Sequence, residues 1–489
     1  MAVSEEQDFV KDITKMSVDF DRWYTDVVRK AELADYSPVR GCMVIRPSGY
    51  ALWENIQRAF DDLIKSTDPP HENMYFPLLI PEDLFMKESE HVEGFAPEVA
   101  WVTEAGKGKG KLDVPLVIRP TSETIIGPIM RRYIQSHRDL PKLTNQWCNV
   151  MRWEMRTRLF LRTAEFLWQE GHTFHATYAE AAGEVMTILG FYRDVAEKWL
   201  AVPVVMGRKS EAEKFAGADY TTSIEGMMRD GLALQMGTSH HLGQNFSRAY
   251  DITFTNRENQ REHCYTTSWG ISTRLIGGLV MAHGDDSGLI LPPRVAAVQV
   301  VVVPIFRDAD SRQKVWAYLE PVVHELRGMG IRHRVDWRDD IRPGQKWAEW
   351  ELRGVPFRVE VGPRDVDADH VVLVDRLTRE KRQVRRMELV THLGRELDLF
   401  HHRLFDRALK FRDENTFERS TLRELVEVFR ERNAFVWAPW CESAECEARV
   451  KEETGGVTTR NFPEDERPSG SCLVCGRPAR RRALFARSY

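Results

Sequence analysis

The sequence contains no long hydrophobic segment and few cysteines. None of its apolar runs reaches the length of about 18 residues that a membrane-spanning helix requires. The first residues, MAVSEEQDF, lack the apolar stretch of a secretory signal. Seven cysteines occur among 489 residues, and without a secretory signal they favour free thiols or metal ligands over disulfides. We therefore expect a cytoplasmic chain that does not enter a membrane.

The sequence also lacks an excess of positive charge. Lys and Arg total 69 against 74 for Asp and Glu, which gives a net charge of −5. This balance excludes indiscriminate coating of nucleic acid but allows a local basic surface. Arginines gather in residues 376–386 (RLTREKRQVRR) and 477–487 (RPARRRALFAR). Each segment is either a solvated face or a local RNA-binding surface, and the sequence favours neither.

Two common nucleotide-binding motifs are missing. The segment 104–112 (EAGKGKGKL) is rich in glycine and lysine, but it lacks the GK-[ST] ending and the strand-to-helix context of a P-loop. We interpret it as a surface hairpin. After residue 296 strands and helices alternate, yet no G-x-G-x-x-G follows the first expected strand. A dinucleotide-binding domain is therefore not favoured there.

A chain of 489 residues is too long for one hydrophobic core, so we expect several domains. The paired prolines near 293 mark one boundary. Beyond them come strands at VQVVVVPI, RHRVDW, PFRVEVG and VVLVDR, separated by helices over about 311–328 and 344–353 and followed by a helix from about 388. This order predicts a small α/β domain with a mixed sheet. The expected domains are residues 1–295, 296–400 and 401–489.

Four of the seven cysteines lie together near the C-terminus. Cys441 and Cys446 form C-x4-C, and Cys472 and Cys475 form C-x2-C. Four thiolates suit a tetrahedral zinc ion, and four protein ligands leave no open coordination position. We therefore expect a structural zinc site, whereas four free thiols would be the alternative.

The residues from Pro115 to Phe174 carry an unusual density of charged and aromatic side chains. Short apolar runs at 116–118 and 149–153 predict two strands. Arg152 and Glu154 would share one face of the second strand, because side chains alternate along a strand. An exposed face with solvated charges or a polar cleft would accommodate such a pair, since unpartnered burial is costly.

Several longer motifs accompany this R-x-E strand in a fixed order. They are PTSET at 120–124, RWE at 152–154, FLRTAEFLWQEGH at 160–172 and GTSHHLGQNF at 237–246. Together they resemble class II aminoacyl-tRNA synthetases, and specifically prolyl-tRNA synthetases of the archaeal/eukaryotic-like type, which have a C-terminal zinc-binding domain. The resemblance covers nearly the whole chain.

The resemblance implies an α+β fold. It comprises a class II antiparallel-sheet catalytic domain, an α/β anticodon-binding domain and a small zinc-binding α+β domain. A helix over 49–66 and a proline-bearing strand MYFPLLI resemble motif 1, which implies a homodimer. The implied reaction joins L-proline to tRNA(Pro) through a prolyl-adenylate made from ATP with Mg²⁺. Tyr489 would return toward the active site.

The resemblance also assigns residues to ATP and to catalysis. Arg152 would hold the proline carboxylate and the α-phosphate together. Arg294 is placed as the motif 3 arginine, near the adenine or the γ-phosphate, and Glu154 near the adenine amine or magnesium. Arg152, Glu154 and Arg294 are thus the expected catalytic residues. The expected ATP-binding residues are Arg152, Glu154, Arg162, Thr163, Phe166, Gln235, Thr238, Ser272, Arg274 and Arg294.

Proline and the anticodon impose their own requirements. A small, rigid secondary ammonium needs oxygen acceptors and an aromatic-lined slot, which Trp269 would close. The expected proline-binding residues are Thr121, Glu123, Arg152, Trp168, Glu170, His172, Phe215 and His240.

The guanines of a proline anticodon suit arginine and carboxylate partners. The expected anticodon-binding residues are Glu351, Arg364 and Asp365, and a surface salt-bridge cluster is the alternative.

Three other classes of protein agree less well with the sequence. A threonyl or glycyl relative is disfavoured because no zinc-ligating Cys and His set occurs near 121–240. A synthetase-like paralogue that binds RNA or protein without aminoacylating usually loses motif residues, which are present here. A zinc-ribbon adaptor would leave residues 1–295 without a role.

Residues 166–284 have the sequence of a catalytic core rather than of an editing insertion. We therefore expect that the protein attaches alanine to tRNA(Pro) by mistake and that another protein removes it.

Overall fold

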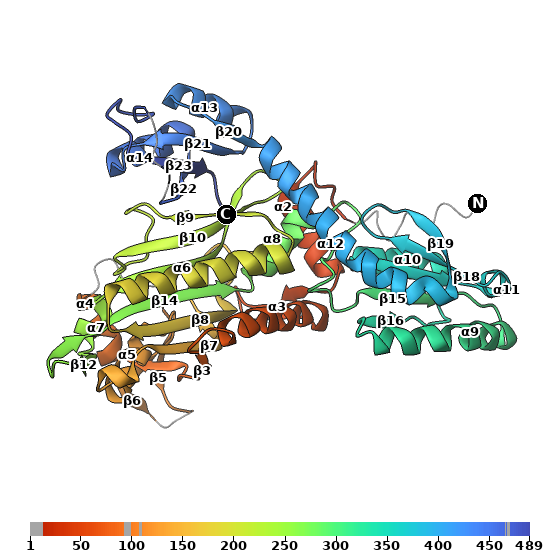
Figure 1. The fold of residues 1–489 in the computed structure, drawn as a ribbon, viewed down its shortest axis with the longest axis horizontal. Helices are drawn as coiled ribbons and strands as arrows, with labels where there is room; N and C mark the ends of the chain where they lie inside the picture. The colour runs from red at the N-terminus through yellow and green to blue at the C-terminus, as the bar shows by residue number, and fades with distance from the viewer. Residues whose placement is uncertain (1–12, 92–98, 107–109, 465, 467–469) are drawn as a thin grey trace.

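The computed structural model describes residues 13–91, 99–106, 110–464, 466 and 470–489 (Figure 1). The expected absence of a signal in the first nine residues, and residues 107–109 of the expected hairpin, lie outside these ranges. Within them, no helix combines the length and apolar character that crossing a bilayer requires. β5 (Trp101–Glu104) and β6 (Lys111–Ile118) pair antiparallel on either side of the glycine- and lysine-rich segment.

The N-terminal domain is built on a seven-stranded sheet in the order β3-β7-β8-β14-β11-β10-β9. Its β3–β7 pair is parallel and its other pairs are antiparallel. The strands are β3 (Glu72–Asn73), β7 (Lys142–Met151), β8 (Glu165–His175), β9 (Val204–Arg208), β10 (Tyr220–Met227), β11 (Ala233–Gly243) and β14 (Tyr265–Ser272).

Helices cover one face of this sheet. They are α2 (Phe20–Lys30), α3 (Pro47–Lys65), α6 (Tyr178–Asp194) with the π-helical turn η2 (Val195–Trp199), and α8 (Arg274–His283). The expected helix over 49–66 is confirmed as α3, whose buried stripe includes Trp53, Ile56, Phe60 and Ile64. Apolar residues at this spacing fall on one side of a helix, which packs into the main core. The other face of the sheet is left for polar side chains.

Smaller elements complete the domain. They are β1 (Ala34–Tyr36), β2 (Met43–Ile45), β4 (Leu79–Pro81), β12 (Thr253–Thr255), β13 (Arg261–His263), α4 (Glu82–His91), α5 (Glu123–Tyr133), α7 (Asn245–Ala249) and η1 (His137–Asp139). β4, β6 and β5 form a separate three-stranded sheet. The expected strand MYFPLLI is shorter than its sequence pattern, because only Leu79 and Ile80 of it lie in β4. Pro77 cannot donate to a strand ladder and lies outside β4.

The middle domain is a mixed five-stranded sheet in the order β16-β15-β17-β18-β19, as expected from the alternating pattern. Its strands are β15 (Val300–Pro304), β16 (His333–Val335), β17 (Phe357–Val361), β18 (His370–Asp375) and β19 (Lys381–Arg385). Its helices are α9 (Ala309–Gly328), α10 (Pro343–Leu352), α11 (Pro363–Asp367) and η3 (Arg386–Glu388). The arginine-rich segment 376–386 contributes β19, a strand that the charge pattern did not predict.

A long helix, α12 (Leu389–Glu414), runs from the middle domain past α8 to the C-terminal domain (Figure 1). The boundary expected between residues 400 and 401 falls inside this continuous helix, so the structure does not divide there. The C-terminal sheet has the order β20-β21-β23-β22. Its elements are β20 (Thr416–Glu418), α13 (Leu422–Glu431), β21 (Phe435–Trp440), α14 (Ala444–Thr454), β22 (Thr458–Asn461) and β23 (Arg481–Ala486).

Candidate active site

A cavity of about 550 Å³ opens on the polar face of the seven-stranded sheet. Strand register explains why polar residues from distant segments meet there. Across four strands, Thr221 lies opposite His240, His240 opposite Ser268, and Ser268 opposite His172. Two residues further along, Thr238, Gly270 and Glu170 form the next row. Because alternate residues share a face, both rows line the cavity.

A β-bulge adds a further residue to this floor. The register between β10 and β11 shifts between Ile224 and Glu225, so that Gly237 pairs with Ile224 and Gln235 with Glu225. In an unbroken strand Gln235 would face away from Thr238, because the two residues are an odd number of positions, three, apart. The extra residue turns Gln235 to the same side, and it lines the cavity with Thr238 and His240.

Arg152 lies at the centre of the cavity wall. Its Nε donates to the Pro120 carbonyl at 2.9 Å, and its guanidinium lies 5.5 Å from the ring centroid of Phe166 and 5.2 Å from that of Trp168. Burial lowers the pKa of Arg152, and the charges of Glu123 and Glu170 oppose this effect. The side chain remains accessible to solvent because one side of it faces the open cavity. A fixed, planar cation of this kind suits a carboxylate or phosphate.

A buried carboxylate network lies beneath Arg152. Glu170 accepts hydrogen bonds from Gln146 at 2.9 Å and from Ser122, and its other oxygen lies 3.1 Å from His172 Nε2. Burial alone would lower the pKa of His172, but the hydrogen bond to Glu170 and the nearby carboxylates raise it. Burial likewise opposes ionisation of Glu170, yet its pKa is lowered by His172 and the neutral donors. The pair therefore gives the cavity floor a fixed charge separation.

The opposite wall is aromatic and uncharged. The rings of Phe215 and His240 lie 4.8 Å apart between centroids, and His240 Nδ1 lies 2.9 Å from the Thr221 hydroxyl. Burial, together with the charges of Lys209, His172 and Arg152, lowers the pKa of His240 to about 3. His240 is therefore neutral at physiological pH. Thr121 donates to Glu123 at the entrance to this slot.

The structure brings together most of the expected site residues. All eight residues assigned to proline line the cavity, and so do six of those assigned to ATP: Arg152, Phe166, Gln235, Thr238, Ser272 and Arg274. Lining residues that were not assigned to the site from the sequence include Lys209, Glu213, Lys214, Thr221 and Ser268. The lysines and Glu213 fall in the segment GRKSEAEKF, and its dense charge was the signal available.

Arg294 does not lie where the resemblance implied. Its guanidinium donates to the Lys198 carbonyl at 2.7 Å and lies 3.9 Å from Asp398 of α12, and it does not line the cavity. A strand followed directly by a helix occurs earlier in the chain, where β14 ends at Ser272 and α8 begins at Arg274. Arg274 lines the cavity, and burial with the charges of neighbouring arginines lowers its pKa to about 10.

The loop between β7 and β8 requires further corrections. β7 ends at Met151, so Arg152 and Glu154 do not lie on one strand face. Glu154 lies 3.4 Å from Arg162, and the Thr163 hydroxyl donates to the Glu165 carbonyl. Glu154, Arg162 and Thr163 do not line the cavity, because the chain leaves the sheet here to form the loop.

Trp269 also differs from expectation. Trp269 is among the residues that line the cavity, but its ring packs in the core on the other face of the sheet, 6.0 Å from Phe60 between centroids. Trp269 alternates with Ser268 and Gly270, which face the cavity. Gly171 makes this position possible, because a Cβ there would lie 2.1 Å from the Trp269 ring.

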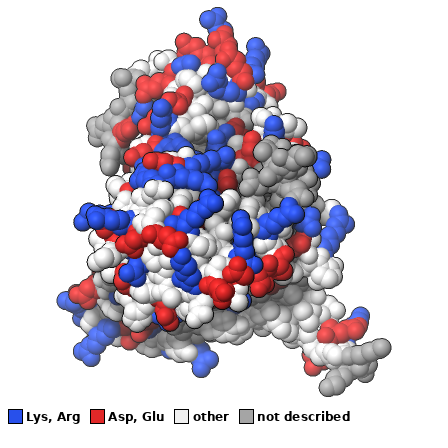
Figure 2. Space-filling view, turned by 90° about the vertical axis from the view of Figure 1, so that its right-hand side faces the viewer, with Lys and Arg blue, Asp and Glu red and all other residues white. Residues whose placement is uncertain are grey.

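The expected anticodon residues lie in two helices of the middle domain, one before and one after the strand β17. Glu351 lies near the C-terminus of α10, before β17, and 3.5 Å from Arg379. It borders a pocket of about 160 Å³ that also includes Arg358, Arg376 and Lys381. Arg364 and Asp365 lie in α11, after β17. Lys and Arg are interspersed with Asp and Glu on the side of the molecule where this domain lies (Figure 2).

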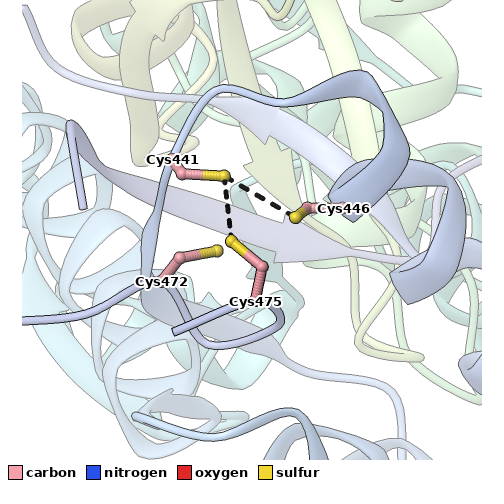
Figure 3. A group of neighbouring side chains, drawn as sticks. All are labelled: Cys441, Cys446, Cys472 and Cys475. Carbon is pink, nitrogen blue, oxygen red and sulfur yellow. Dashed lines mark hydrogen bonds between the residues drawn. The ribbon is translucent and has the colours of Figure 1, made fainter. Parts of the chain in front are cut away.

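The C-terminal cysteines form a compact cluster (Figure 3). Cys441 follows β21, Cys446 lies in α14, and Cys472 and Cys475 lie in one turn before β23. All four sulfur atoms lie within 4.8 Å of one another, and Cys441 Sγ is 3.6 Å from Cys446 Sγ and 3.7 Å from Cys475 Sγ. A tetrahedral ion with bonds of about 2.3 Å separates its ligands by about 3.8 Å, so the cluster fits zinc.

Comparisons with known proteins agree with this architecture. Residues 109–283 match the family "tRNA synthetase class II core domain (G, H, P, S and T)", residues 299–396 "Anticodon binding domain", and residues 422–489 "Prolyl-tRNA synthetase, C-terminal". These matches follow the expected order along the chain.

Full-length relatives are closely similar. The chain is 52% identical over 495 residues to a proline–tRNA ligase of Symbiobacterium thermophilum and 49% identical over 490 residues to proline–tRNA ligase 2 of Clostridioides difficile, in both cases over 100% of each chain. A crystal structure of prolyl-tRNA synthetase from Cryptosporidium parvum, complexed with halofuginone and AMPPNP, superposes with a TM-score of 0.92 at 41% identity. The match covers 97% of this chain and 99% of that one. The chain therefore belongs to the prolyl-tRNA synthetase family of class II aminoacyl-tRNA synthetases.

Proposed function

We propose that this protein attaches L-proline to tRNA(Pro) through a prolyl-adenylate intermediate. In the first step a carboxylate oxygen of proline attacks the α-phosphate of ATP, and the bond to pyrophosphate breaks. In the second, a hydroxyl of the tRNA 3′-terminal ribose takes the prolyl group and AMP leaves. The observation that carries this proposal is one cavity that combines fixed cations, buried carboxylates and an aromatic slot.

The residues divide between the two substrates. Arg152 would bridge the proline carboxylate and the α-phosphate, and Arg274 would stabilise charge on the phosphates, which is the main task in phosphate displacement. Glu123 and Thr121 supply oxygen acceptors for the proline ammonium. Trp168 and the Phe215–His240 wall enclose the ring. ATP enters with Mg²⁺, which neutralises phosphate charge.

Neutral His240 matters for this arrangement. A protonated imidazole beside the slot would repel the substrate ammonium, whereas the low pKa of His240 keeps the wall uncharged. His172, whose pKa is raised by the hydrogen bond to Glu170, lies 3.1 Å from that carboxylate. A small ammonium compound therefore meets acceptors at the entrance and no competing cation on the aromatic wall.

The remaining parts fit the same reaction. We infer that the middle domain reads the anticodon with Glu351, Arg364 and Asp365, and that the protein is a cytoplasmic homodimer of the archaeal/eukaryotic-like type. Exposed apolar side chains near α3 support a dimer surface and include Tyr36, Val39, Val44 and Tyr50. The four cysteines would hold a structural zinc ion, which ties β21 and α14 to the turn before β23.

The test of the proposed reaction is ATP–pyrophosphate exchange with each of the twenty amino acids and no tRNA. We expect strong exchange with proline, weak exchange with alanine and none with threonine or glycine. No exchange with any amino acid, from a folded preparation, would contradict the proposal and favour a binding paralogue. Zinc content is measured on the same preparation, and a Cys472→Ser/Cys475→Ser variant should lose the metal.

A further inference from the structure

The C-terminal domain docks directly against two strands of the N-terminal sheet. Phe462 and Arg208 exchange backbone hydrogen bonds of 2.8 Å, and the Asn461 amide donates to the Val205 carbonyl at 2.9 Å. Gly207 permits this close approach, because a Cβ there would lie 2.6 Å from the Phe462 carbonyl oxygen. β22 therefore lies beside β9 and β10, next to the substrate cavity.

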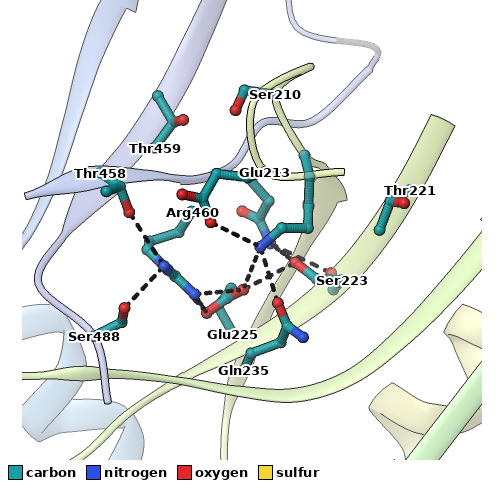
Figure 4. A network of polar contacts seen from close by, with 12 residues as sticks. Ser210, Glu213, Thr221, Ser223, Glu225, Gln235, Thr458, Thr459, Arg460 and Ser488 are labelled. Carbon is teal, nitrogen blue, oxygen red and sulfur yellow. Dashed lines mark hydrogen bonds and ion pairs between the residues drawn. The ribbon is translucent and has the colours of Figure 1, made fainter. Parts of the chain in front are cut away.

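Within this contact, Arg460 of β22 reaches Glu225 of β10 (Figure 4). Arg460 Nε and Nη2 lie 3.2 and 3.1 Å from Glu225 Oε2. Arg460 Nη1 also donates to the hydroxyls of Thr458 and Ser488. Glu225 is 0% exposed and Arg460 5% exposed, so each charge depends on the other rather than on water.

A second cation competes for the same carboxylate. Lys209 is 4% exposed and lines the cavity. Its Nζ donates to Gln235 Oε1 at 2.9 Å, but it lies 3.9 Å from Glu225 Oε1 and 3.9 Å from Glu213 Oε2. Glu225 Oε1 instead accepts from Ser223 at 3.0 Å. Lys209 therefore hydrogen-bonds to the cavity residue Gln235, and it lies within ion-pair distance of Glu225 but beyond hydrogen-bonding distance from it.

The charges explain why this arrangement is stable. Arg460 already neutralises Glu225, so the attraction between Glu225 and Lys209 is not needed to satisfy the buried carboxylate. If Arg460 were uncharged, Glu225 would retain a buried negative charge and Lys209 would be the nearest cation. A shift of about 1 Å would bring Lys209 into hydrogen-bonding distance of Glu225 and away from Gln235.

We propose that Arg460 is a positioning residue for the substrate cavity, which acts from the C-terminal domain by occupying Glu225 and thereby keeping Lys209 on Gln235. The inference rests on the proposed function, in which Gln235 contacts ATP. It adds Lys209 to the ATP-binding residues. It also gives the C-terminal domain a role in amino-acid activation, before any tRNA is bound.

The experiment measures the KM for ATP and kcat in proline-dependent exchange, with ATP affinity determined separately by calorimetry. Arg460→Met should raise the KM for ATP about tenfold, with a smaller change in kcat. The reason is that the charged hydrogen bond from Lys209 to Gln235 is lost, and this bond contributes equally to binding of ATP and of the transition state. Lys209→Met should have a similar effect. The double variant Arg460→Met/Lys209→Met should have a KM for ATP no higher than that of Lys209→Met alone, since both changes remove the same hydrogen bond between Lys209 and Gln235.

Two variants separate positioning from simple destabilisation. Arg460→Met/Glu225→Gln removes both buried charges, so Lys209 has no competing partner and the KM for ATP should return to within about threefold of wild type. Asn433→Ala breaks a different contact between the same domains, a 3.1 Å bond to the Asp230 carbonyl, and does not touch the cavity. It should leave the KM unchanged.

Three results would overturn the inference. They are an unchanged KM in Arg460→Met, losses that multiply in the double variant, or no recovery with Glu225→Gln in a folded protein. Failure of the proposed function is distinct, because the wild type would then show no exchange. Calorimetric ATP binding would still test the Arg460 network in that case.

Discussion

The hydroxyl of Tyr489, the last residue of the chain, donates a hydrogen bond to the carboxylate of Asp230. The Tyr489 ring also lies beneath the Arg158 guanidinium, 5.2 Å from its centroid. Arg158 belongs to the loop between β7 and β8, and its backbone pairs with that of Arg162. The C-terminus is thus fixed against the loop that begins at the cavity residue Arg152.

Tyr489→Phe should lower the free energy of unfolding by about 1–3 kcal/mol, because it leaves a largely buried acceptor on Asp230 with fewer donors. Burial raises the pKa of Asp230, and the Tyr489 hydrogen bond opposes this effect. Urea unfolding followed by tryptophan fluorescence measures the change. Tyr133→Phe, at a half-exposed tyrosine, is the matched control. Equal stability of the two variants would show that the bond contributes nothing.

Arg274→Ala and Arg294→Ala should separate the two candidate motif 3 arginines. Loss of a preorganised cation at the phosphates typically costs about 100- to 1,000-fold in rate, so Arg274→Ala should nearly abolish proline-dependent exchange. Arg294→Ala should change the rate less than about twofold, because Arg294 contacts Lys198 and Asp398 outside the cavity. The reverse result would restore Arg294 to the catalytic set.

Alanine should be activated weakly and should persist on tRNA(Pro). Each missing methylene in an apolar slot costs about 1–3 kcal/mol, which limits discrimination. Between Phe166 and Gly284, where every residue is described, the chain forms β8 to α8 and contains no separate inserted domain. Purified protein should therefore hydrolyse alanyl-tRNA(Pro) no faster than buffer alone. Rapid release of alanine by the protein itself would refute this prediction.

Replacing Glu351 and Arg364 together with alanine should raise the KM for tRNA(Pro) and leave tRNA-independent exchange unchanged. The two residues flank β17, whose five residues span about 16 Å, so an RNA segment that contacts both must extend along the strand. Glu320→Ala, on an exposed position of α9, provides the control. A folded double variant that loses exchange would contradict the assignment.

Stability should fall as the pH drops below about 6.5. Burial lowers the pKa of His175, His240 and His283 to about 3 in each case. Between the ordinary value and about 3 the unfolded chain binds these protons and the folded chain does not, so acid favours unfolding. Three such groups give a slope of about 4 kcal/mol per pH unit. The raised pKa of His172 opposes part of this slope, because its stabilisation is present at low pH and lost as pH rises.

The matched variant is His283→Gln. His283 Nε2 lies 2.7 Å from the Leu200 carbonyl, and glutamine offers a donor at a similar position without titrating. Denaturant unfolding at pH 7.5, 6.5 and 5.5 should show that the free energy of unfolding falls over this range by about 1.4 kcal/mol less in the variant than in the wild type. An identical slope would show that His283 is protonated in the folded protein.

Much of this protein is determined locally. Apolar stripes at helical spacing predicted α3, alternating elements predicted the mixed sheet of the middle domain, and four cysteines at short spacings predicted the cysteine cluster. These features depend on residues within one or two elements, so periodicity and motif spacing suffice. Seven of the eight residues assigned to proline lie in the named motifs, Phe215 lies outside them, and the fold brings all eight to the cavity.

Only the tertiary structure decided which charged residues reach the cavity. Arg274 and Arg294 both lie near glycines in the chain, but only the pairing of β14 with β8 and β11 brings Arg274 to the cavity. Gln235 faces the cavity because of a bulge, and Lys209 is held there by Arg460 from another domain. Strand register and domain docking join residues far apart in the chain, and a local pattern carries no information about such partners.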